Sequence, residues 1–159
     1  MSNEVAMPPR VLKSIDNLKP LAGGELGTSD WLTITQERID AFAQATGDRQ
    51  WIHCNPDRAA AESPFGATIA HGFLTLSLGP SLMDELFRIE GARLAINYGL
   101  NRVRYPAAVR VGSRLRLRLR LLDVQDIPDG IQATFQQTFE VDGQDKPVCV
   151  AEAVLRWLK

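Results

Sequence analysis

The sequence has few cysteines and histidines, almost no net charge and no long apolar run. Its 159 residues include two cysteines and two histidines, and the formal net charge is -1 at pH 7. So small a charge gives no bulk attraction to nucleic acid or to an acidic membrane. No stretch approaches the roughly 20 apolar residues that a membrane-spanning helix needs. Because the histidines belong to no Cys/His cluster of ligand spacing, the sequence predicts no metal site.

The first residues lack the charged and then apolar pattern of a secretory signal. We therefore expect a cytoplasmic protein, in which Cys54 and Cys149 are reduced thiols. Residues 1–12 show no periodicity and contain Pro8–Pro9, so we expect a flexible N-terminal arm there. Residues 13–159 suffice for a single domain with a substantial core, since 45% of the chain is apolar.

Three helices are predicted in the first ninety residues. Thr35–Gly47 has an N-cap residue at its start and, just past its end, a glycine suited to the left-handed conformation. Asn55–Pro56 begins a second, short helix that ends near residue 61. From about residue 72 to 88, leucines recur every four residues and further apolar side chains widen the stripe, which predicts a long buried helix. Gly79–Pro80 should kink it.

After Gly91 the apolar pattern changes to a period of two. Leucine alternates with arginine from Arg114 to Leu121, and Asp129–Gly130 is a hairpin turn signal. We expect strands near residues 31–34, 94–105, 114–121, 131–141 and 148–157. Helices followed by consecutive hairpin-linked strands predict an α+β fold, in which one face of an antiparallel sheet covers the long helix.

The chemically distinctive residues fall in two short stretches. The first places Asp48 five positions before His53, and the second contains His71 and Gly72. A carboxylate and an imidazole with one water between them can serve as an acid/base pair. A glycine N–H at the start of a helix can bind an oxygen that develops negative charge.

Each of these residues also has a structural interpretation. Asp48 could be an ordinary turn residue after a helix, and His53 a core histidine with satisfied hydrogen bonds. We assign His71 to structure, where it fixes the loop by hydrogen bonds. Cys54 neighbours His53, but adjacent side chains on an extended segment point in opposite directions, which argues against a Cys–His nucleophile.

Taken together, the two stretches resemble a known family. Gly47–Asp48, Ile52–His53 and Ala59 are similar to the hydratase-2 motif of the MaoC-like dehydratases, also called (R)-specific enoyl-CoA hydratases. Ile69–Gly72 resembles the start of their central helix. Three segments resemble the nodulation-protein-N-like branch of that family: Gly27–Trp31, Gly47–His53 and Asn97–Arg104.

This resemblance implies a hot-dog fold, in which a long antiparallel sheet wraps around a central helix, and a homodimer with active sites near the subunit interface. It implies Asp48 and His53 as the catalytic pair and the N–H of Gly72 as the donor to the thioester oxygen. The implied substrate is a thioester of coenzyme A or of acyl-carrier protein, with no separate cofactor. The implied reaction is reversible hydration of a trans-2-enoyl-CoA to an (R)-3-hydroxyacyl-CoA.

Two other functions remain open, because a fold does not fix a chemistry. One is a hot-dog acyl-CoA thioesterase, and the other is a non-catalytic protein that binds acyl thioesters. The chain also departs from the family motif. Gln50–Trp51 stands where the motif usually has Asn-Pro. Trp51 lies between the two candidate catalytic residues and is a candidate to shape the acyl pocket. A helix serine found in some members falls at about Pro80, and we leave its neighbour Ser81 outside the site.

Nine arginines and a single acidic residue, Glu90, lie between Arg88 and Arg120. We interpret them as a solvated outer face of the strands. Attraction for the phosphates of coenzyme A is the alternative, since arginine binds phosphate well. Asn97 and Asn101 are interpreted as cross-strand hydrogen-bonding residues in preference to substrate contacts. Trp31 and Trp157 are expected in the core.

Overall fold

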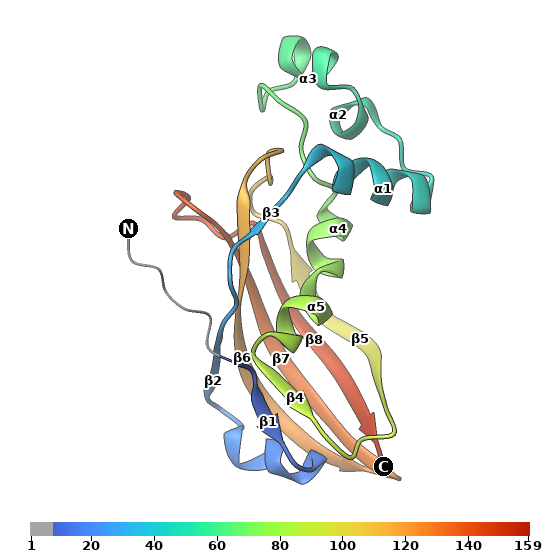
Figure 1. The fold of residues 1–159 in the computed structure, drawn as a ribbon, viewed down its shortest axis with the longest axis vertical. Helices are drawn as coiled ribbons and strands as arrows, with labels where there is room; N and C mark the ends of the chain where they lie inside the picture. The colour runs from blue at the N-terminus through green and yellow to red at the C-terminus, as the bar shows by residue number, and fades with distance from the viewer. Residues whose placement is uncertain (1–7) are drawn as a thin grey trace.

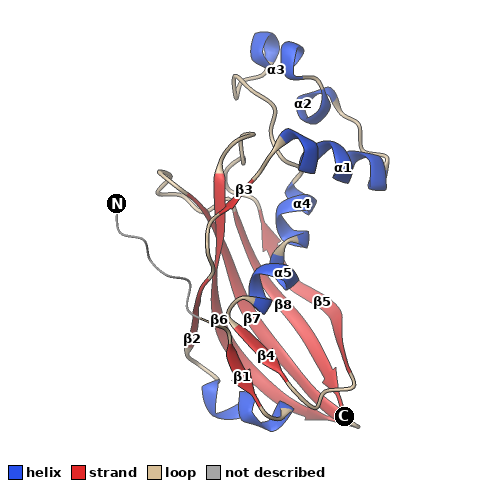
Figure 2. Ribbon diagram, viewed as in Figure 1, coloured by secondary structure: helices blue, strands red, loops and turns tan. Residues whose placement is uncertain are grey.

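The computed structural model describes residues 8–159, which form a curved antiparallel sheet with helices along one face and at one end (Figures 1 and 2). The strands are β1 (Arg10–Leu12), β2 (Glu25–Thr28), β3 (Leu32–Thr33), β4 (Phe87–Ile89), β5 (Leu94–Arg104), β6 (Arg114–Ile127), β7 (Gly130–Val141) and β8 (Cys149–Leu158). The helices are a 3₁₀ helix η1 (Ile15–Leu21), α1 (Gln36–Thr46), α2 (Trp51–Cys54), α3 (Pro56–Glu62), α4 (Gly72–Ser77) and α5 (Gly79–Asp84). The main sheet has the order β2-β6-β7-β8-β5, and β3 also pairs with β6.

The predicted ends of α1 and α3 are confirmed. The Thr35 hydroxyl accepts a hydrogen bond from the main-chain N–H of Arg38, and Gly47 ends α1 in the left-handed conformation at φ 81°. Asn55 caps α3 in the same way, with Pro56 at the first helical position. These two caps fix the end of α1 and the start of α3. They therefore bound the segment that carries the proposed catalytic pair.

The predicted long helix is shorter than expected and is divided in two. α4 and α5 meet at Leu78–Gly79, so the interruption expected at Gly79–Pro80 is confirmed. The helical segment ends at Asp84 instead of residue 88, and Phe87–Ile89 forms β4. This end was predicted wrongly because Phe87 continues the four-residue apolar spacing, although in the fold its ring stacks on Phe135 of β7, with centroids 6.0 Å apart.

The beginning of the described chain is also more ordered than predicted. Residues 1–7 of the expected arm lie outside the described residues, but Arg10–Leu12 form β1, which pairs in parallel with β4. The following residues form η1, whose Ile15 and Leu18 are buried. No sequence pattern predicted these elements, because a three-residue strand and a seven-residue 3₁₀ helix are too short to show a period.

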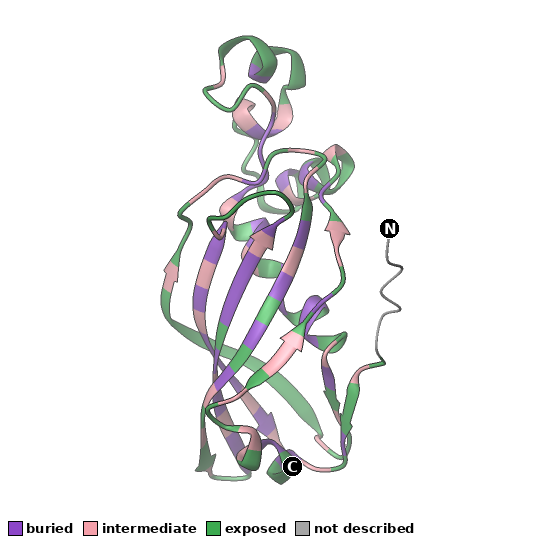
Figure 3. Cartoon of the chain, turned by 90° about the vertical axis from the view of Figure 1, so that its left-hand side faces the viewer, coloured by how far each residue is buried: buried purple, intermediate pink, exposed green. Residues whose placement is uncertain are grey.

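The core lies between α4–α5 and the concave face of the sheet. Leu115, Leu117, Leu119 and Leu121 of β6 are fully buried, whereas the arginines between them face outward, as the alternation predicted. Figure 3 shows the same alternation of buried and exposed positions along the sheet. From the helix side, the core receives Leu74, Leu78, Leu82 and Met83. The sheet therefore wraps around the helical segment, as expected for a hot-dog fold.

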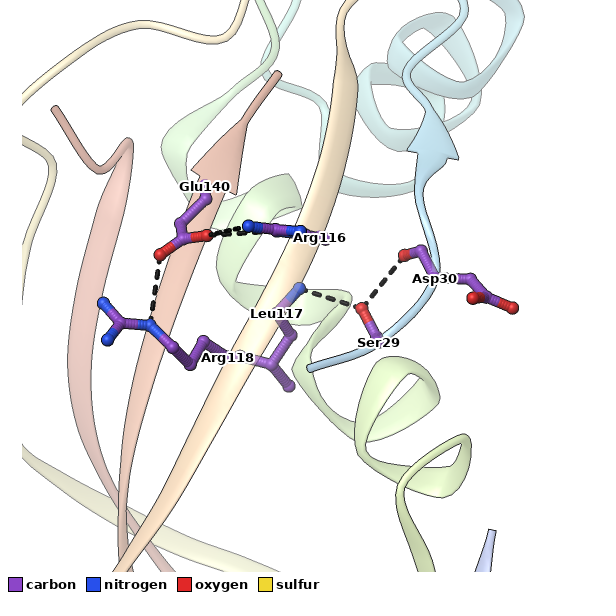
Figure 4. Close-up of polar contacts among 6 residues, drawn as sticks. All are labelled: Ser29, Asp30, Arg116, Leu117, Arg118 and Glu140. Atoms are coloured by element: carbon purple, nitrogen blue, oxygen red, sulfur yellow. Dashed lines mark hydrogen bonds and ion pairs between the residues drawn. The ribbon is translucent and has the colours of Figure 1, made fainter. Parts of the chain in front are cut away.

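The outer face of β6 confirms our interpretation of the arginines there. Arg116 and Arg118 both pair with Glu140 of β7, at 3.0 and 3.1 Å (Figure 4). Arg116 also lies over the ring of Trp31, 4.4 Å from its centroid. Trp31 is thus half-buried under arginine, so our expectation that it lies in the core is wrong. Trp157 is buried, as expected.

Between the ends of β2 and β3, the buried Ser29 bonds to β6 through both its main chain and its side chain. The Ser29 hydroxyl accepts the N–H of Leu117 at 2.9 Å and donates to the main-chain oxygen of Asp30 at 3.0 Å (Figure 4). This contact lies within the segment that resembles the nodulation-protein-N-like branch, and its role is structural.

Strand β5 forms one end of the sheet order and pairs with β8. The Asn101 amide donates to Glu152 at 2.7 Å, which confirms a cross-strand role for this asparagine. Asn97 lines a separate pocket of about 430 Å³ between α5, β4 and β5. Two register shifts, between Asn97/Gly99 and between Leu100/Arg102, interrupt the two-residue period along the strand.

Among the described residues, no helix has the length and apolar character needed to cross a bilayer.

Candidate active site

Asp48 lies in the loop between α1 and α2, directly after the left-handed Gly47. Its N–H donates to the Thr46 hydroxyl at 3.3 Å, and its carboxylate accepts the N–H of Gln50 at 3.4 Å. Both bonds are long and span two residues. The carboxylate is exposed, so solvent reaches it.

His53 lies on α2, a four-residue helix that is not among the three helices predicted from the sequence. The ring is buried, and Nδ1 lies 2.6 Å from the main-chain oxygen of Ile69. Because a carbonyl oxygen only accepts, we assign the hydrogen to Nδ1, which leaves the lone pair on Nε2. Burial lowers the pKa of His53 from 6.5, against the opposing effect of the Ile69 bond. A neutral ring with a free Nε2 lone pair is a base.

The carbonyl that orients His53 is itself held in place. The N–H of Ile69 donates to the oxygen of Ile52 at 3.0 Å, and Ile69 forms an isolated antiparallel bridge with Arg110. The ring nitrogen is therefore fixed through main-chain bonds between segments that lie far apart in sequence.

The carboxylate and the imidazole are brought together as the sequence predicted. One ligand atom from each of Asp48, His53 and His71 lies within 4.8 Å of the others. A water that bridges two groups by hydrogen bonds of about 2.8 Å each holds them at up to about this separation. The arrangement can therefore hold one water molecule between an acid and a base.

The same three residues, Asp48, His53 and His71, are of types that can bind a metal ion. Nδ1 of His53 and Nε2 of His71 are both within hydrogen-bond distance of carbonyl oxygens. The two rings stack with centroids 3.8 Å apart and planes 25° apart. Zinc–imidazole bonds of about 2.0–2.1 Å lie in the ring plane, so two nearly parallel rings cannot direct their lone pairs at one ion. The cluster suits water better than a metal.

His71 makes the structural contact that we expected, with an unexpected partner. Its Nε2 lies 2.9 Å from the main-chain oxygen of Asp48, and its ring is buried against those of His53 and Phe42. The loop that it fixes is thus the one that carries the proposed carboxylate.

Cys54 offers no nucleophile. Burial, and then the charge of Asp40, raise its pKa, so the thiolate is disfavoured. Our argument that His53 and Cys54 diverge on an extended segment was wrong, since both lie on a helix. Within the described part of the chain, no hydrogen bond joins the two side chains.

Gly72 is the first residue of α4 and follows His71 directly. Its N–H is among those that begin a helix without an acceptor inside it. A pocket of about 360 Å³ opens beside it, bounded by Ile69, Gly72, Thr75 and the segment from Tyr105 to Val109. A Cβ at Gly72 would lie 3.1 Å from the Tyr105 ring, so this glycine permits a close approach.

Asp48 and His53 do not line this pocket, but Ile69, whose main-chain oxygen lies 2.6 Å from His53 Nδ1, does. Trp51 lines neither of these two pockets, and the Arg58 guanidinium lies over its ring, 4.3 Å from the centroid. A role of Trp51 in shaping the acyl pocket stays a prediction. Ser81, which we left out of the site, is exposed and lies on α5, nine residues after Gly72. The contact of Tyr105 with Gly72 had no sequence signal, since the two residues are far apart in the chain.

Comparison with known proteins identifies the family. A model described as "MaoC like domain" matches residues 18–141 of the chain. The chain belongs to this family. A 3-hydroxyacyl-thioester dehydratase Z from Mycobacterium tuberculosis is 53% identical to the MaoC-like chain over 150 residues, which cover 94% of this chain and 99% of that protein. Nodulation protein N from Rhizobium leguminosarum bv. viciae is 43% identical over 140 residues, which cover 87% of each.

The solved structures confirm the fold. A monoamine oxidase regulatory protein from Archaeoglobus matches the MaoC-like chain with a TM-score of 0.79 at 21% identity, over 96% of this chain and 99% of that one. The hot-dog fold, the resemblance to MaoC-like dehydratases and the nodulation-protein-N-like branch are therefore all confirmed. The chain is a hydro-lyase, the enzyme class of its dehydratase relatives.

Proposed function

We propose that this MaoC-like protein is an (R)-specific enoyl-CoA hydratase, which reversibly adds water to a trans-2-enoyl-CoA and gives an (R)-3-hydroxyacyl-CoA. The observation that carries the proposal is the convergence of Asp48 and His53, within 4.8 Å, next to the start of α4. A relative named as a 3-hydroxyacyl-thioester dehydratase supports a thioester substrate. The (R) configuration and coenzyme A as the thiol follow from the family resemblance.

In the proposed reaction, Asp48 and Nε2 of His53 hold the water. His53 takes a proton from it while the water oxygen bonds to C3 of the substrate. The electron pair of the C2–C3 double bond moves toward the thioester, and the N–H of Gly72 binds the oxygen that gains negative charge. The imidazolium then returns its proton to C2, which completes the addition of one water. The Asp48 carboxylate stabilises the imidazolium between these steps.

The pocket beside Gly72 is the proposed place for the acyl thioester. Its volume of about 360 Å³ lies within the range of small-ligand sites. Thr75 and the segment from Tyr105 to Val109 line it, so the acyl chain would pass between α4 and the loop after β5. The proposed reaction needs no cofactor besides the coenzyme A of the substrate. We propose that the protein acts in the cytoplasm.

Hydration of crotonyl-CoA tests the proposal through the loss of enoyl-thioester absorbance. We expect the parent protein to hydrate it and Asp48→Asn and His53→Gln to lose roughly 10²–10⁴-fold in kcat, the usual contribution of a positioned acid or base. Variants that hydrate as fast as the parent would contradict the assignment. A thiol-trapping assay run in parallel separates the alternatives: release of free coenzyme A indicates a thioesterase, and binding without turnover indicates a binding protein.

A further inference from the structure

His71 contacts both members of the proposed catalytic pair but takes no part in the reaction described above. It is the N-cap residue of α4 and is 3% exposed. Its Nε2 lies 2.9 Å from the main-chain oxygen of Asp48, and its ring stacks on that of His53 at 3.8 Å. Phe42 of α1 covers it as well, with centroids 5.0 Å apart and planes at 53°.

The hydrogen bonds assign opposite tautomers to the two histidines. Nε2 of His71 must carry its hydrogen, because the Asp48 oxygen can only accept. Nδ1 of His71 is buried and has no hydrogen-bond partner in residues 8–159, so it gains nothing from a hydrogen. In His53 the hydrogen lies on Nδ1, which faces the Ile69 oxygen. Two stacked rings are thus each fixed by a main-chain carbonyl, through different nitrogens.

The Asp48 loop has few other attachments to the fold. Its remaining side-chain bonds, to Thr46 and Gln50, are 3.3 and 3.4 Å long and stay within two residues of Asp48. The 2.9 Å bond from His71 spans 23 residues and ties this loop to the start of the central helix. The placement of the carboxylate relative to His53 therefore depends on His71.

We propose that His71 is a positioning residue, which sets the geometry of the Asp48–His53 pair by holding the main chain of the first and the ring face of the second. This inference rests on the function proposed for the pair. It predicts two separable contributions from one side chain: an N–H donor to the Asp48 carbonyl, and an aromatic ring that keeps water from one face of His53.

The surroundings of His53 fix the direction of the expected pH effect. Asp48 from the α1–α2 loop and His71 from the start of α4 act on its charge, while Asp40 of α1 and Arg49 act on the neighbouring Cys54. Burial is the largest cause of its lowered pKa. If a smaller, non-aromatic side chain replaces His71, water reaches the ring, and the pKa of His53 rises toward 6.5.

Two variants separate the two contributions. His71→Phe keeps an aromatic ring but has no donor, and His71→Gln keeps an amide donor but has no ring. We expect each to lower kcat for crotonyl-CoA by roughly ten- to a hundredfold, the scale of a misplacement by about 1 Å, with a smaller change in KM. The acid limb of kcat/KM should move to higher pH in both variants, because both remove the charge effect of His71 on His53, and further in His71→Gln, where water also reaches the ring. Phe87→Leu, a core change on β4, is the control: it lowers stability without moving the acid limb.

Nuclear magnetic resonance of the imidazole nitrogens tests the geometry without any assay of activity. The chain has two histidines, so His71→Phe leaves only the signals of His53. In the parent protein we expect one ring with hydrogen on Nδ1 and the other with hydrogen on Nε2. The pKa of His53 should rise in His71→Gln.

Rings with the same tautomer, or a His53 signal unchanged in both variants together with the parent kcat, would overturn the positioning role. Opposite tautomers and a shifted His53 pKa in a protein that does not hydrate crotonyl-CoA would support the geometry and instead overturn the proposed function. The two failures are therefore distinguishable.

Discussion

His53 can act as a base only through Nε2, because its other ring nitrogen donates to Ile69. The direction of its pKa shift decides when that nitrogen is free. Burial lowers the pKa, so the ring stays neutral at pH values where an exposed histidine would already carry a proton. A base that is neutral near pH 7 is suited to accept a proton from water in the proposed hydration.

This shift predicts how activity and stability respond to pH. As pH falls below 6.5, the unfolded chain protonates His53 first and the native protein does not, so acid favours unfolding. We expect the free energy of unfolding to fall as pH decreases from 6.5, and the acid limb of kcat/KM to lie below 6.5. Urea unfolding between pH 5 and 8 and a pH–rate profile measure the two effects. His53→Gln should remove this part of the pH dependence of stability, and an unchanged dependence would contradict the assignment.

The close approach of Tyr105 makes Gly72 sensitive to a single methyl group. In Gly72→Ala the new Cβ would lie 3.1 Å from the ring, which must move and narrow the pocket. We expect kcat/KM for crotonyl-CoA to fall at least about tenfold, because the ring that lines the pocket must shift. Steady-state kinetics of Gly72→Ala, Tyr105→Leu and the double variant measure the coupling between the two residues. Additive losses would show that the ring contact is not the cause.

At the scale of the residue, the sequence predicted the site residues that belong to short local motifs. Asp48, His53 and Gly72 are recognisable because they stand in short ordered patterns. The structure brings Asp48 and His53 within 4.8 Å of His71, the residue before Gly72. The stacking of His71 on His53 and the contact of Tyr105 with Gly72 join segments that are far apart in sequence. Spacing along one chain contains no information about such contacts.

At the scale of the element, prediction succeeded where caps and periods are strong. The alternation along β6 and the caps of α1 and α3 were sufficient to place these elements. It failed at the end of the central helix, since an apolar spacing of four fits both a helix and the buried residues of β4. It also missed α2, whose four residues are held by tertiary contacts such as the bond from His53 to Ile69.

The two faces of β6 should differ strongly in their effect on stability. Leu117 is fully buried opposite Phe139, so Leu117→Ala should lower the free energy of unfolding by roughly 2–5 kcal/mol through lost burial and a cavity. Arg118, the next residue, pairs with Glu140 in partly exposed surroundings, and Arg118→Ala should cost less than about 1 kcal/mol. Chemical denaturation of both variants measures the difference. Equal costs would contradict the assignment of the leucine face to the core.

At the scale of the whole molecule, strand β5 is the conspicuous open edge. Leu94, Ile96, Tyr98 and Leu100 are 37–56% exposed along it, although monomeric proteins usually protect such an edge with charge or with short strands. A second copy that pairs through the same strand would cover it by a two-fold arrangement. The homodimer implied by the family resemblance is therefore a prediction that this edge supports.

Charge placed on β5 tests the dimer. We expect the parent protein to sediment as a dimer and Leu100→Lys to shift it toward the monomer, because a lysine on each strand would bring like charges together in an apolar contact. Gln125→Lys, at an exposed position of β6, is the matched control and should leave the mass unchanged. Analytical ultracentrifugation gives the result. A parent that is monomeric at all concentrations would exclude this interface.

The two thiols of the chain have a practical consequence for the enzymology. Cys149 begins β8 in the core, where burial raises its pKa to about 12, and the pKa of Cys54 is raised as well. Disulfide-exchange dyes react with thiolates, so the native protein should develop colour slowly while free coenzyme A develops it at once. A colorimetric reading of released coenzyme A can thus be taken on the intact catalyst with little background, and a late rise in that background would report global unfolding.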